Sequence, residues 1–219
     1  MSGRETISSL IELLKRLYPE AECQLRYQGI PERLVIATIL SAQTTDAAVN
    51  KATPVLWKKY STMKDLASAD RSHVEDILKT IGLFRNKTGF IIKAAGFMAE
   101  KGLPDTIDEL IKMPGVGRKT ANVIMGEIFG QPSITVDTHV KRLSARLGLT
   151  DHTDPGKIEM DLKKIIPEEE QTMFSHRLIT HGRNICKARK PLCSVCSLSS
   201  FCPYCKKWSP QKRTPLKTT

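Results

Sequence analysis

The chain has 219 residues and a strong excess of positive charge, because 34 Lys and Arg residues against 23 Asp and Glu give a formal net charge of +11. Its 40% hydrophobic and 26% charged residues are those of an ordinary globular protein. The most apolar run, LVIATIL at 34–40, is far too short to cross a bilayer, and the start shows no secretory signal. The composition therefore excludes an integral membrane protein and favours a polyanionic partner, with nucleic acid ahead of a membrane surface.

Helical periodicity dominates the chain, and no segment alternates polar and apolar residues as a strand would. The first twenty residues predict an amphipathic helix. Two further helices should begin at Pro31, in the first turn, and at Asp46, as a cap. Ser72 should precede a fourth, which Gly82 ends. The remaining predicted helices cover 86–101, 105–111, 118–129, 138–147, 155–166 and 169–184. We predict an all-α fold.

The segment DTIDELIKMPGVGRKTANVIMGEIFG predicts a short helix, a Pro-Gly-Val-Gly hairpin and a second helix. Gly115 and Gly117 allow positive φ and leave no side chain between the backbone and a ligand. The amides of Gly115, Gly117 and Arg118 would then face outward at a helix N-terminus, which is a natural phosphate site. Such a hairpin grips a DNA backbone without reading its sequence. The alternative is a plain corner between two helices.

Lys119 falls in the first turn of the second helix of this hairpin. The positive end of the helix dipole and Arg118 both disfavour an ammonium there, and a neutral lysine amine can form a Schiff base. The simpler interpretation is a solvated surface lysine. Asp137 precedes the helix at 138–147, where capping alone would account for it. A capping carboxylate can also handle protons or stabilise a developing cation.

Four cysteines near the end follow the spacing C-x6-C-x2-C-x5-C. They are Cys186, Cys193, Cys196 and Cys202. Four thiolates this close can hold one iron–sulfur cluster or one zinc ion. Cys193-x2-Cys196 and Cys202-x2-Cys205 resemble a zinc ribbon, but only five residues separate these pairs, against about 15–20 in ribbons. Because that scheme also leaves Cys186 without a role, the spacing favours the iron–sulfur cluster.

The first gap of the cysteine spacing is basic, since it contains Lys187, Arg189 and Lys190. A metal centre that pins such a loop suggests that the loop faces something anionic. Clustered cysteines in a basic protein indicate metal in a reducing compartment rather than disulfides, so we expect an intracellular protein.

Three further segments join the cysteine loop in one resemblance: LSAQTTD at 40–46, PGVGRKTANV at 114–123 and VDTHVKR at 136–142. Together they resemble the endonuclease III family, the bifunctional DNA glycosylases of the helix–hairpin–helix superfamily. The likeness runs in the same order over about residues 5 to 205. It implies one [4Fe-4S] cluster bound by Cys186, Cys193, Cys196 and Cys202.

The resemblance also implies a two-lobed architecture. Residues 23–133 would form a six-helix barrel that contains the hairpin, and residues 1–22 with 134–205 would form the iron–sulfur domain. The Pro-, Lys- and Thr-rich tail at 206–219 is predicted to be disordered.

The activity implied by the resemblance is base-excision repair of oxidised pyrimidines. The damaged pyrimidine must leave the base stack, because its C1′ atom is inaccessible inside the duplex. Lys119 would attack C1′ as the base departs, while Asp137 helps to deprotonate the lysine and stabilises positive charge on the sugar. The Schiff base then allows β-elimination, so that glycosylase and abasic-site lyase activities share one lysine.

Three more residues are expected to contact DNA. By resemblance, Gln43 fills the void left by the flipped nucleotide and Leu83 wedges into the opposite strand. Without the resemblance they would be an ordinary loop glutamine and a core leucine. His139 is expected to be structural or to contact DNA rather than to take part in catalysis.

Two alternative functions remain open. A monofunctional mismatch glycosylase of the same superfamily would share the hairpin and the cluster, but it has another residue in place of Lys119. A non-catalytic, redox-sensing DNA-binding module would need no pairing of Lys119 with Asp137. We expect a monomer that acts on double-stranded DNA with damaged pyrimidines or abasic sites, in the cytoplasm and nucleoid of a prokaryote.

Overall fold

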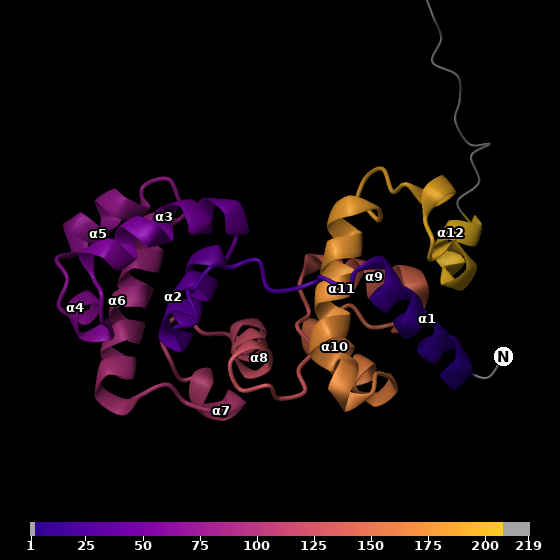
Figure 1. Ribbon diagram of the computed structural model, residues 1–219, viewed down its shortest axis with the longest axis horizontal. Coiled ribbons are helices and arrows are strands. Elements are labelled where there is room, and N and C mark those ends of the chain that lie inside the picture. Colours follow the sequence, from indigo (N-terminus) through magenta and orange to yellow (C-terminus); the bar gives the residue numbers. More distant parts are fainter. Residues whose placement is uncertain (1–2, 208–219) are drawn as a thin grey trace, which may run out of the picture. The chain divides into compact units, whose positions relative to one another are not determined.

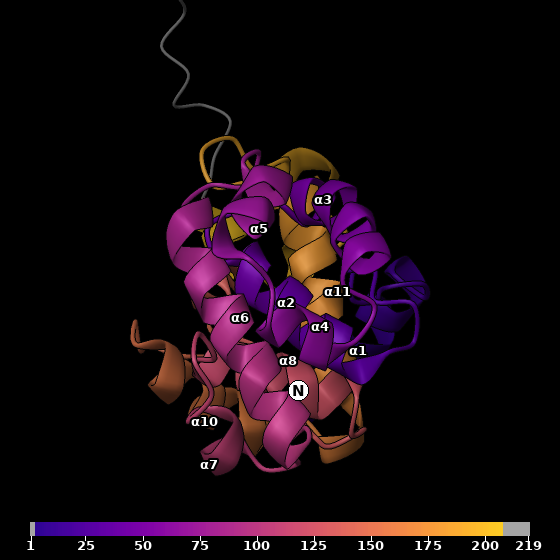
Figure 2. The same cartoon turned by 90° about the vertical axis from the view of Figure 1, so that its left-hand side faces the viewer.

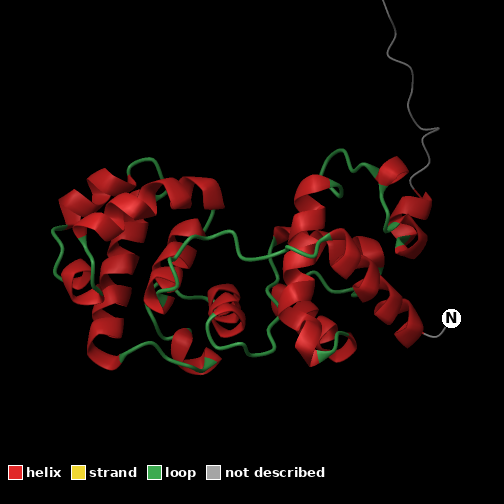
Figure 3. Ribbon diagram, in the orientation of Figure 1, coloured by secondary structure: helices red, strands yellow, loops and turns green. Residues whose placement is uncertain are grey.

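The computed structural model describes residues 3–207, with side chains from residue 5 onward. Every regular element in that range is helical, which confirms the predicted all-α fold (Figure 3). The chain divides into two compact units: Cys23–Ser133 forms one, and the segments before and after it form the other. No helix among the described residues is long and apolar enough to span a membrane.

The Cys23–Ser133 unit is built around α2 (Pro31–Ser41), which starts with proline at a first-turn position. Residues 34–40 are all buried, so this helix carries an uninterrupted apolar run rather than a stripe. Around it pack α3 (Asp46–Lys59), α6 (Phe84–Lys101) and α8 (Arg118–Glu127) (Figures 1 and 2). The shorter helices of this unit are α4 (Met63–Ala67), α5 (Arg71–Leu78) and α7 (Ile107–Leu110).

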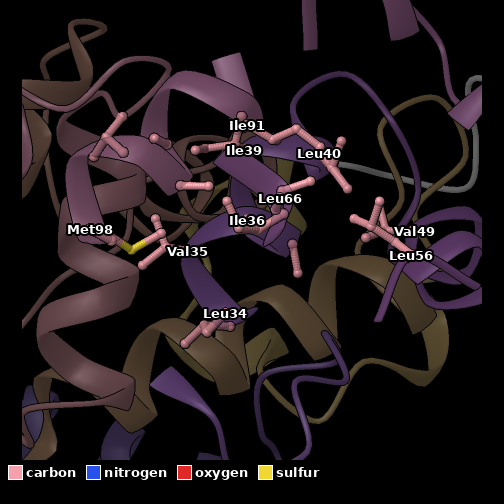
Figure 4. Packing of buried hydrophobic residues seen from close by; sticks show 14 of the residues in the cluster. Leu34, Val35, Ile36, Ile39, Leu40, Val49, Leu56, Leu66, Ile91 and Met98 are labelled. Carbon is pink, nitrogen blue, oxygen red and sulfur yellow. The ribbon is translucent and has the colours of Figure 1, made fainter. Parts of the chain in front are cut away.

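The hydrophobic core of this unit joins residues that are far apart in the sequence (Figure 4). Ile36 and Leu40 of α2 are fully buried together with Leu56 of α3, Leu66 of α4 and Ile91 of α6. Each such side chain contributes roughly 1.5–3 kcal/mol by leaving water. The core thereby fixes α2 and α6, the two helices on which the hairpin rests.

The second unit contains five α-helices in the described part: α1 (Gly3–Leu17), α9 (Thr138–Leu147), α10 (Pro155–Ile165), α11 (Gln171–Asn184) and α12 (Pro203–Lys207). Helix α11 packs against α1 and α9, and α9 also packs against α10 and α12. Leu10, Ile11 and Leu14 of α1 are buried, in agreement with the amphipathic pattern of the sequence. The same core includes Cys202, so the cysteine loop is attached to it.

Several helix ends differ from the sequence expectations. Thr45, not Asp46, caps α3, because its hydroxyl accepts a hydrogen bond from Ala48 N. Asp70 caps α5, because its carboxylate accepts hydrogen bonds from Ser72 N and His73 N, and this helix ends at Leu78, before Gly82.

The predicted tail also starts too early. Pro203 begins α12, which continues to Lys207, so 206–207 are helical rather than disordered. The rest of that prediction, 208–219, lies outside the described residues.

Candidate functional site

The hairpin between α7 and α8 depends on Gly115. Its φ is +81°, a left-handed conformation that side chains other than glycine disfavour. A Cβ atom at this position would lie 2.9 Å from Phe90 Cβ and 3.1 Å from Ile39 Cγ2. Both conformation and space therefore require glycine, which lets the hairpin backbone rest directly on α6 and α2.

Gly117 does not use the positive φ that a glycine allows. Its φ is −99°, which any residue adopts. Gly117 is the N-cap of α8 and offers no side chain to cap it, and the space around its Cβ position is open. Gly117, Arg118 and Lys119 are all exposed. An exposed helix start without a side-chain cap suits the binding of a phosphate.

Asp137 caps α9 in the second unit, whereas Lys119 belongs to the Cys23–Ser133 unit. Asp137 Oδ1 accepts hydrogen bonds from His139 N at 2.7 Å and Val140 N at 2.8 Å, as a capping aspartate should. Its Oδ2 atom lies 2.8 Å from His139 Nδ1. The ring of His139 therefore orients the carboxylate, which is a structural role for this histidine.

Gln43 and Leu83 share an unusual backbone conformation. Their φ angles are +54° and +59°, and among the described residues the only other non-glycine with positive φ is Gln28. Both side chains are exposed, and Leu83 keeps 58% of its accessible surface, so it is not a core leucine. Such conformations cost of order 1–3 kcal/mol each and concentrate at functional sites.

Two arginines of α9 hold the start of the cysteine loop. Arg142 Nε donates to Cys186 O at 3.0 Å. Arg146 donates from Nη1 to Lys187 O and from Nη2 to Ala188 O, each at 2.9 Å. These bonds fix the backbone of the basic segment. The side chains of that segment predicted to bind DNA, Lys187, Arg189 and Lys190, are exposed.

Arg146 also connects the two ends of the loop. Its Nη1 atom lies 3.1 Å from Cys186 Sγ, and its backbone oxygen lies 3.3 Å from Cys202 Sγ. Its guanidinium stands over the ring of Tyr204 in α12, 4.4 Å from the centroid. The first and the last cysteine of the spacing thus contact the same arginine.

The chemistry of the loop fits an iron–sulfur cluster. Burial raises the pKa of the Cys196 and Cys202 thiols, and neighbouring thiols raise it further. N–H groups face both sulfurs: Leu198 N bonds to Cys196, and Cys205 N lies 3.4 Å from Cys202 Sγ. Crowded, half-buried thiols that face N–H donors suit a soft metal centre that takes them as thiolates.

Among residues 3–207, no group of three or more Cys, His, Asp or Glu side chains is arranged to hold a single metal ion. In a [4Fe-4S] cluster each thiolate binds a different iron atom, so the four sulfurs need not surround one point.

Cys205 lies beside the cysteines of the loop, although it is not part of the C-x6-C-x2-C-x5-C spacing. Its Sγ atom is 3.6 Å from Cys193 O. Burial, followed by the hydrogen bond with the Cys205 thiol, raises the pKa of Cys193 to about 12.

Sequence reasoning missed several residues that support the loop. Arg142 and Arg146 stand four positions apart on one face of α9, which is the only signal that could have paired them. His181 is buried, with Nε2 3.5 Å from Cys196 Sγ and Nδ1 2.7 Å from the hydroxyl of Tyr18. Burial lowers the pKa of His181 to about 4, so its ring is neutral.

One cavity, of about 650 Å³, lies in the second unit between α1 and residues 164–170. None of the residues predicted to bind DNA, to catalyse or to bind metal lines it.

Comparison with known proteins places this architecture. Residues 36–168 match the model of the HhH-GPD superfamily base excision DNA repair protein, and residues 186–202 match the iron-sulfur binding domain of endonuclease III. Endonuclease III of Synechocystis sp. is 48% identical over 206 residues, which are 92% of this chain and 94% of that protein. The chain belongs to the endonuclease III family.

Further relatives agree with this assignment. Endonuclease III of Bacillus subtilis is 41% identical over 92% of this chain and 94% of its own length. A trapped covalent endonuclease III–DNA intermediate, in an estranged-adenine complex, has a TM-score of 0.88 and 42% identity, covering 94% of this chain and 99% of that one.

Family membership confirms the main predictions from the sequence. The chain is a base-excision repair enzyme, a bifunctional DNA glycosylase and abasic-site lyase, with a [4Fe-4S] cofactor. The match over 186–202 decides between the iron–sulfur cluster and the zinc ion that the spacing alone left open.

Proposed function

We propose that this enzyme removes oxidised pyrimidines from duplex DNA and then cleaves the strand, with Lys119 as the nucleophile of both steps. The observation that carries the proposal is the position of Lys119. It is exposed in the first turn of α8, directly after a glycine hairpin whose helix start has no side-chain cap. A phosphate held at that start would bring the neighbouring sugar toward the lysine.

DNA binding at the hairpin would use the backbone of Gly115 and Gly117 together with Arg118. Gly115 lets the turn lie close against α2 and α6, and Gly117 leaves the helix start open to a ligand. The contacts would go to phosphate oxygens and would therefore be independent of sequence. Lesion choice must then come from the base that is flipped out, with Gln43 and Leu83 contacting the opened helix.

The proposed chemistry runs through one covalent intermediate. Lys119 Nζ forms a bond to C1′ while the bond from C1′ to the damaged base breaks, and the base leaves with its electron pair. The sugar ring opens to a Schiff base, a proton is lost from C2′, and the 3′ phosphate departs by β-elimination. Water hydrolyses the imine and restores the lysine amine.

Asp137 would take the proton of Lys119 and stabilise the positive charge that develops on the sugar. The capping bonds and His139 fix the orientation of its carboxylate. Capping uses Oδ1, whereas Oδ2 faces the ring of His139, so Oδ2 is the oxygen that we propose for the proton of Lys119.

The ligands of the cluster would be Cys186, Cys193, Cys196 and Cys202. When bound, the cluster supplies iron–thiolate bonds that close the loop and hold its basic segment in place. Base removal takes place at the hairpin and does not involve the cluster. Arg142 and Arg146 contribute the protein side of this support.

The partner we propose is double-stranded DNA with a damaged pyrimidine or an abasic site, bound by a monomer. A net charge of +11 favours association with any duplex and makes binding strongly salt-dependent. We place the enzyme in the nucleoid of a prokaryotic cell, where its substrate lies.

A strand-cleavage assay on a duplex with one thymine glycol tests the role of Lys119. Lys119→Gln should lose base release and cleavage by at least about 10³-fold, because an amide cannot form the Schiff base. Lys112→Gln removes an equal charge from the other side of the hairpin and should alter binding only. Equal loss in both variants, or cleavage by Lys119→Gln, would contradict the proposal.

Single replacements of the cysteines test the ligand set. Each of the four proposed ligands changed to Ser should lower the iron and sulfide content, whereas Cys205→Ser should keep four irons per chain. A normal iron content in any of the four variants, or loss of iron only in Cys205→Ser, would overturn this assignment.

A further inference from the structure

One buried lysine of α6 lies between the loops that contain Gln43 and Leu83. Lys87 is only 4% exposed, and its Nζ atom donates a hydrogen bond to Thr44 Oγ1 at 2.6 Å. Its backbone N–H donates to Leu83 O at 3.1 Å, which is the ordinary first-turn hydrogen bond of α6, because Leu83 is the N-cap of this helix. Thr44 directly follows Gln43 in the sequence, so the Lys87 side chain connects the start of α6, where Leu83 lies, to the neighbour of Gln43.

Burial of the Lys87 ammonium lowers the stability of the folded state. Lysines are almost never fully buried without an ionic partner. Among the described residues Lys87 has no carboxylate partner, and its ammonium has a single hydroxyl acceptor. Burial accordingly lowers the pKa of Lys87. A methionine would fill a similar volume without this cost, so stability alone gives no reason for a charge here.

The two loops need an external restraint. Gln43 and Leu83 adopt left-handed conformations that persist only where the surroundings hold them. The loops touch at Gly82, whose Cβ position lies 3.7 Å from Thr44 Oγ1 and 3.8 Å from Gln43 O. The Lys87 ammonium closes this contact with a side-chain hydrogen bond from α6 to the 41–45 loop.

We propose that Lys87 is a positioning residue that holds Gln43 and Leu83 in a fixed relation for insertion into the DNA helix. The inference rests on the proposed function, in which these two residues occupy the helix opened around a flipped nucleotide. Lys87 itself is buried and does not contact DNA. Its ammonium holds Thr44 against the start of α6, the helix end at which Leu83 is the N-cap.

This role predicts a specific kinetic defect. Extrusion of the base requires the side chains of Gln43 and Leu83 to enter the DNA helix together. The Schiff-base step requires only that C1′ reach Lys119. Loss of the Lys87 ammonium should therefore slow reaction on a stacked thymine glycol, and should affect a preformed abasic site much less. Misplacement of a contact by about 1 Å can cost of order 10²-fold in rate.

The experiment compares Lys87→Met with Lys93→Met, which removes the same charge from the exposed face of the same helix. We expect single-turnover base release from thymine glycol to fall about 10–100-fold in Lys87→Met only. Fluorescence of a 2-aminopurine next to the lesion, which reports opening of the stack, should fall in parallel. The melting temperature should be unchanged or higher, since a buried charge is removed.

A second pair of variants tests the same bond from its other side and leaves Lys87 in place. Thr44→Val removes the hydroxyl acceptor and should reproduce the slow base release of Lys87→Met. Thr44→Ser keeps a hydroxyl and should release the base at the wild-type rate. If Lys87→Met does not fold, this pair decides the question. In a Gln43→Ala background, Lys87→Met should add less than its effect in the wild type, because both changes disable one insertion step.

The outcomes separate this inference from the proposed function. An inactive wild-type enzyme on both substrates would remove the proposed function itself. An active wild type with Lys87→Met equal to Lys93→Met would overturn only the role of Lys87. The same holds if the effects of Lys87→Met and Gln43→Ala multiply independently, or if thymine glycol and the abasic site slow equally.

Discussion

The hairpin at 111–118 and the cysteine loop at 186–202 both offer exposed positive groups, but they are held in different ways. The hairpin is held by its own backbone: Gly115 takes a left-handed conformation and packs against Phe90. The cysteine loop is held by side chains of another helix, with Arg142 and Arg146 bonded to its carbonyls. The comparison indicates that the hairpin should respond to changes in backbone freedom, and the loop to changes in distant side chains and in its cofactor.

Alanine substitutions at the two hairpin glycines should give the largest effect, and they test whether the backbone of Gly115 holds the hairpin. Gly115→Ala should destabilise the protein by about 2–4 kcal/mol, because overpacking against Phe90 adds to the strain of a left-handed alanine. Gly117→Ala should stay within about 0.5 kcal/mol, since its conformation is ordinary and the space is open. Thermal unfolding measures both, and equal effects would show that the backbone of Gly115 is not what holds the hairpin.

A substitution of Arg146 tests whether side chains of α9 hold the cysteine loop. Arg146→Met removes hydrogen bonds to two carbonyls and to Cys186 Sγ. Loss of such supporting bonds should speed release of the cluster to a chelator about 10–100-fold. The decay of the visible absorbance of the cluster gives the rate. Lys141→Met, on the exposed face of α9, is the matched control, and an equal rate in both variants would contradict the role of Arg146.

The hydrogen bonds of Asp161 in the second unit should contribute a smaller part of the stability, and this part should depend on pH. Hydrogen bonds from the Thr150 hydroxyl and then from His152 hold the pKa of Asp161 below its ordinary value. Its contribution to stability is therefore present above the pKa of the unfolded chain and is lost as pH falls through the lower, folded pKa.

Melting temperatures at a series of acid pH values measure this contribution. The gap between wild type and Asp161→Asn should shrink as pH falls below the ordinary aspartate pKa of about 3.9. The gap for Gly115→Ala should stay constant throughout, because no titratable group is lost there. A constant gap for Asp161→Asn would show that the bonds of Asp161 do not stabilise the fold.

The difference between the two regions also explains what the sequence could predict. The hairpin and the helix at 138–147 depend on local residues, and periodicity with glycine placement located both. Which of the two glycines takes a positive φ was not predictable, because packing against Phe90 decides it. The cysteine spacing indicated the cofactor, whereas its arginine supports come from a helix some forty residues earlier.

Lys87 illustrates the same limit. In the segment FRNKTGF a lysine on a helix is expected to be solvated, and nothing nearby signals its burial. Its partner Thr44 lies 43 positions away, so only the folded core brings them together. Residues that act through such contacts are found from the structure, while Lys119 and the cysteines carry their signal in the sequence itself.

The most direct test of the account is to locate the covalent bond. Wild-type enzyme is incubated with a thymine glycol duplex in the presence of borohydride, and the protein–DNA adduct is digested and mapped by mass spectrometry. Lys119 should be the one modified lysine, and Lys119→Gln should form no adduct. An adduct on any other lysine, or base release without an adduct, would contradict the proposed nucleophile.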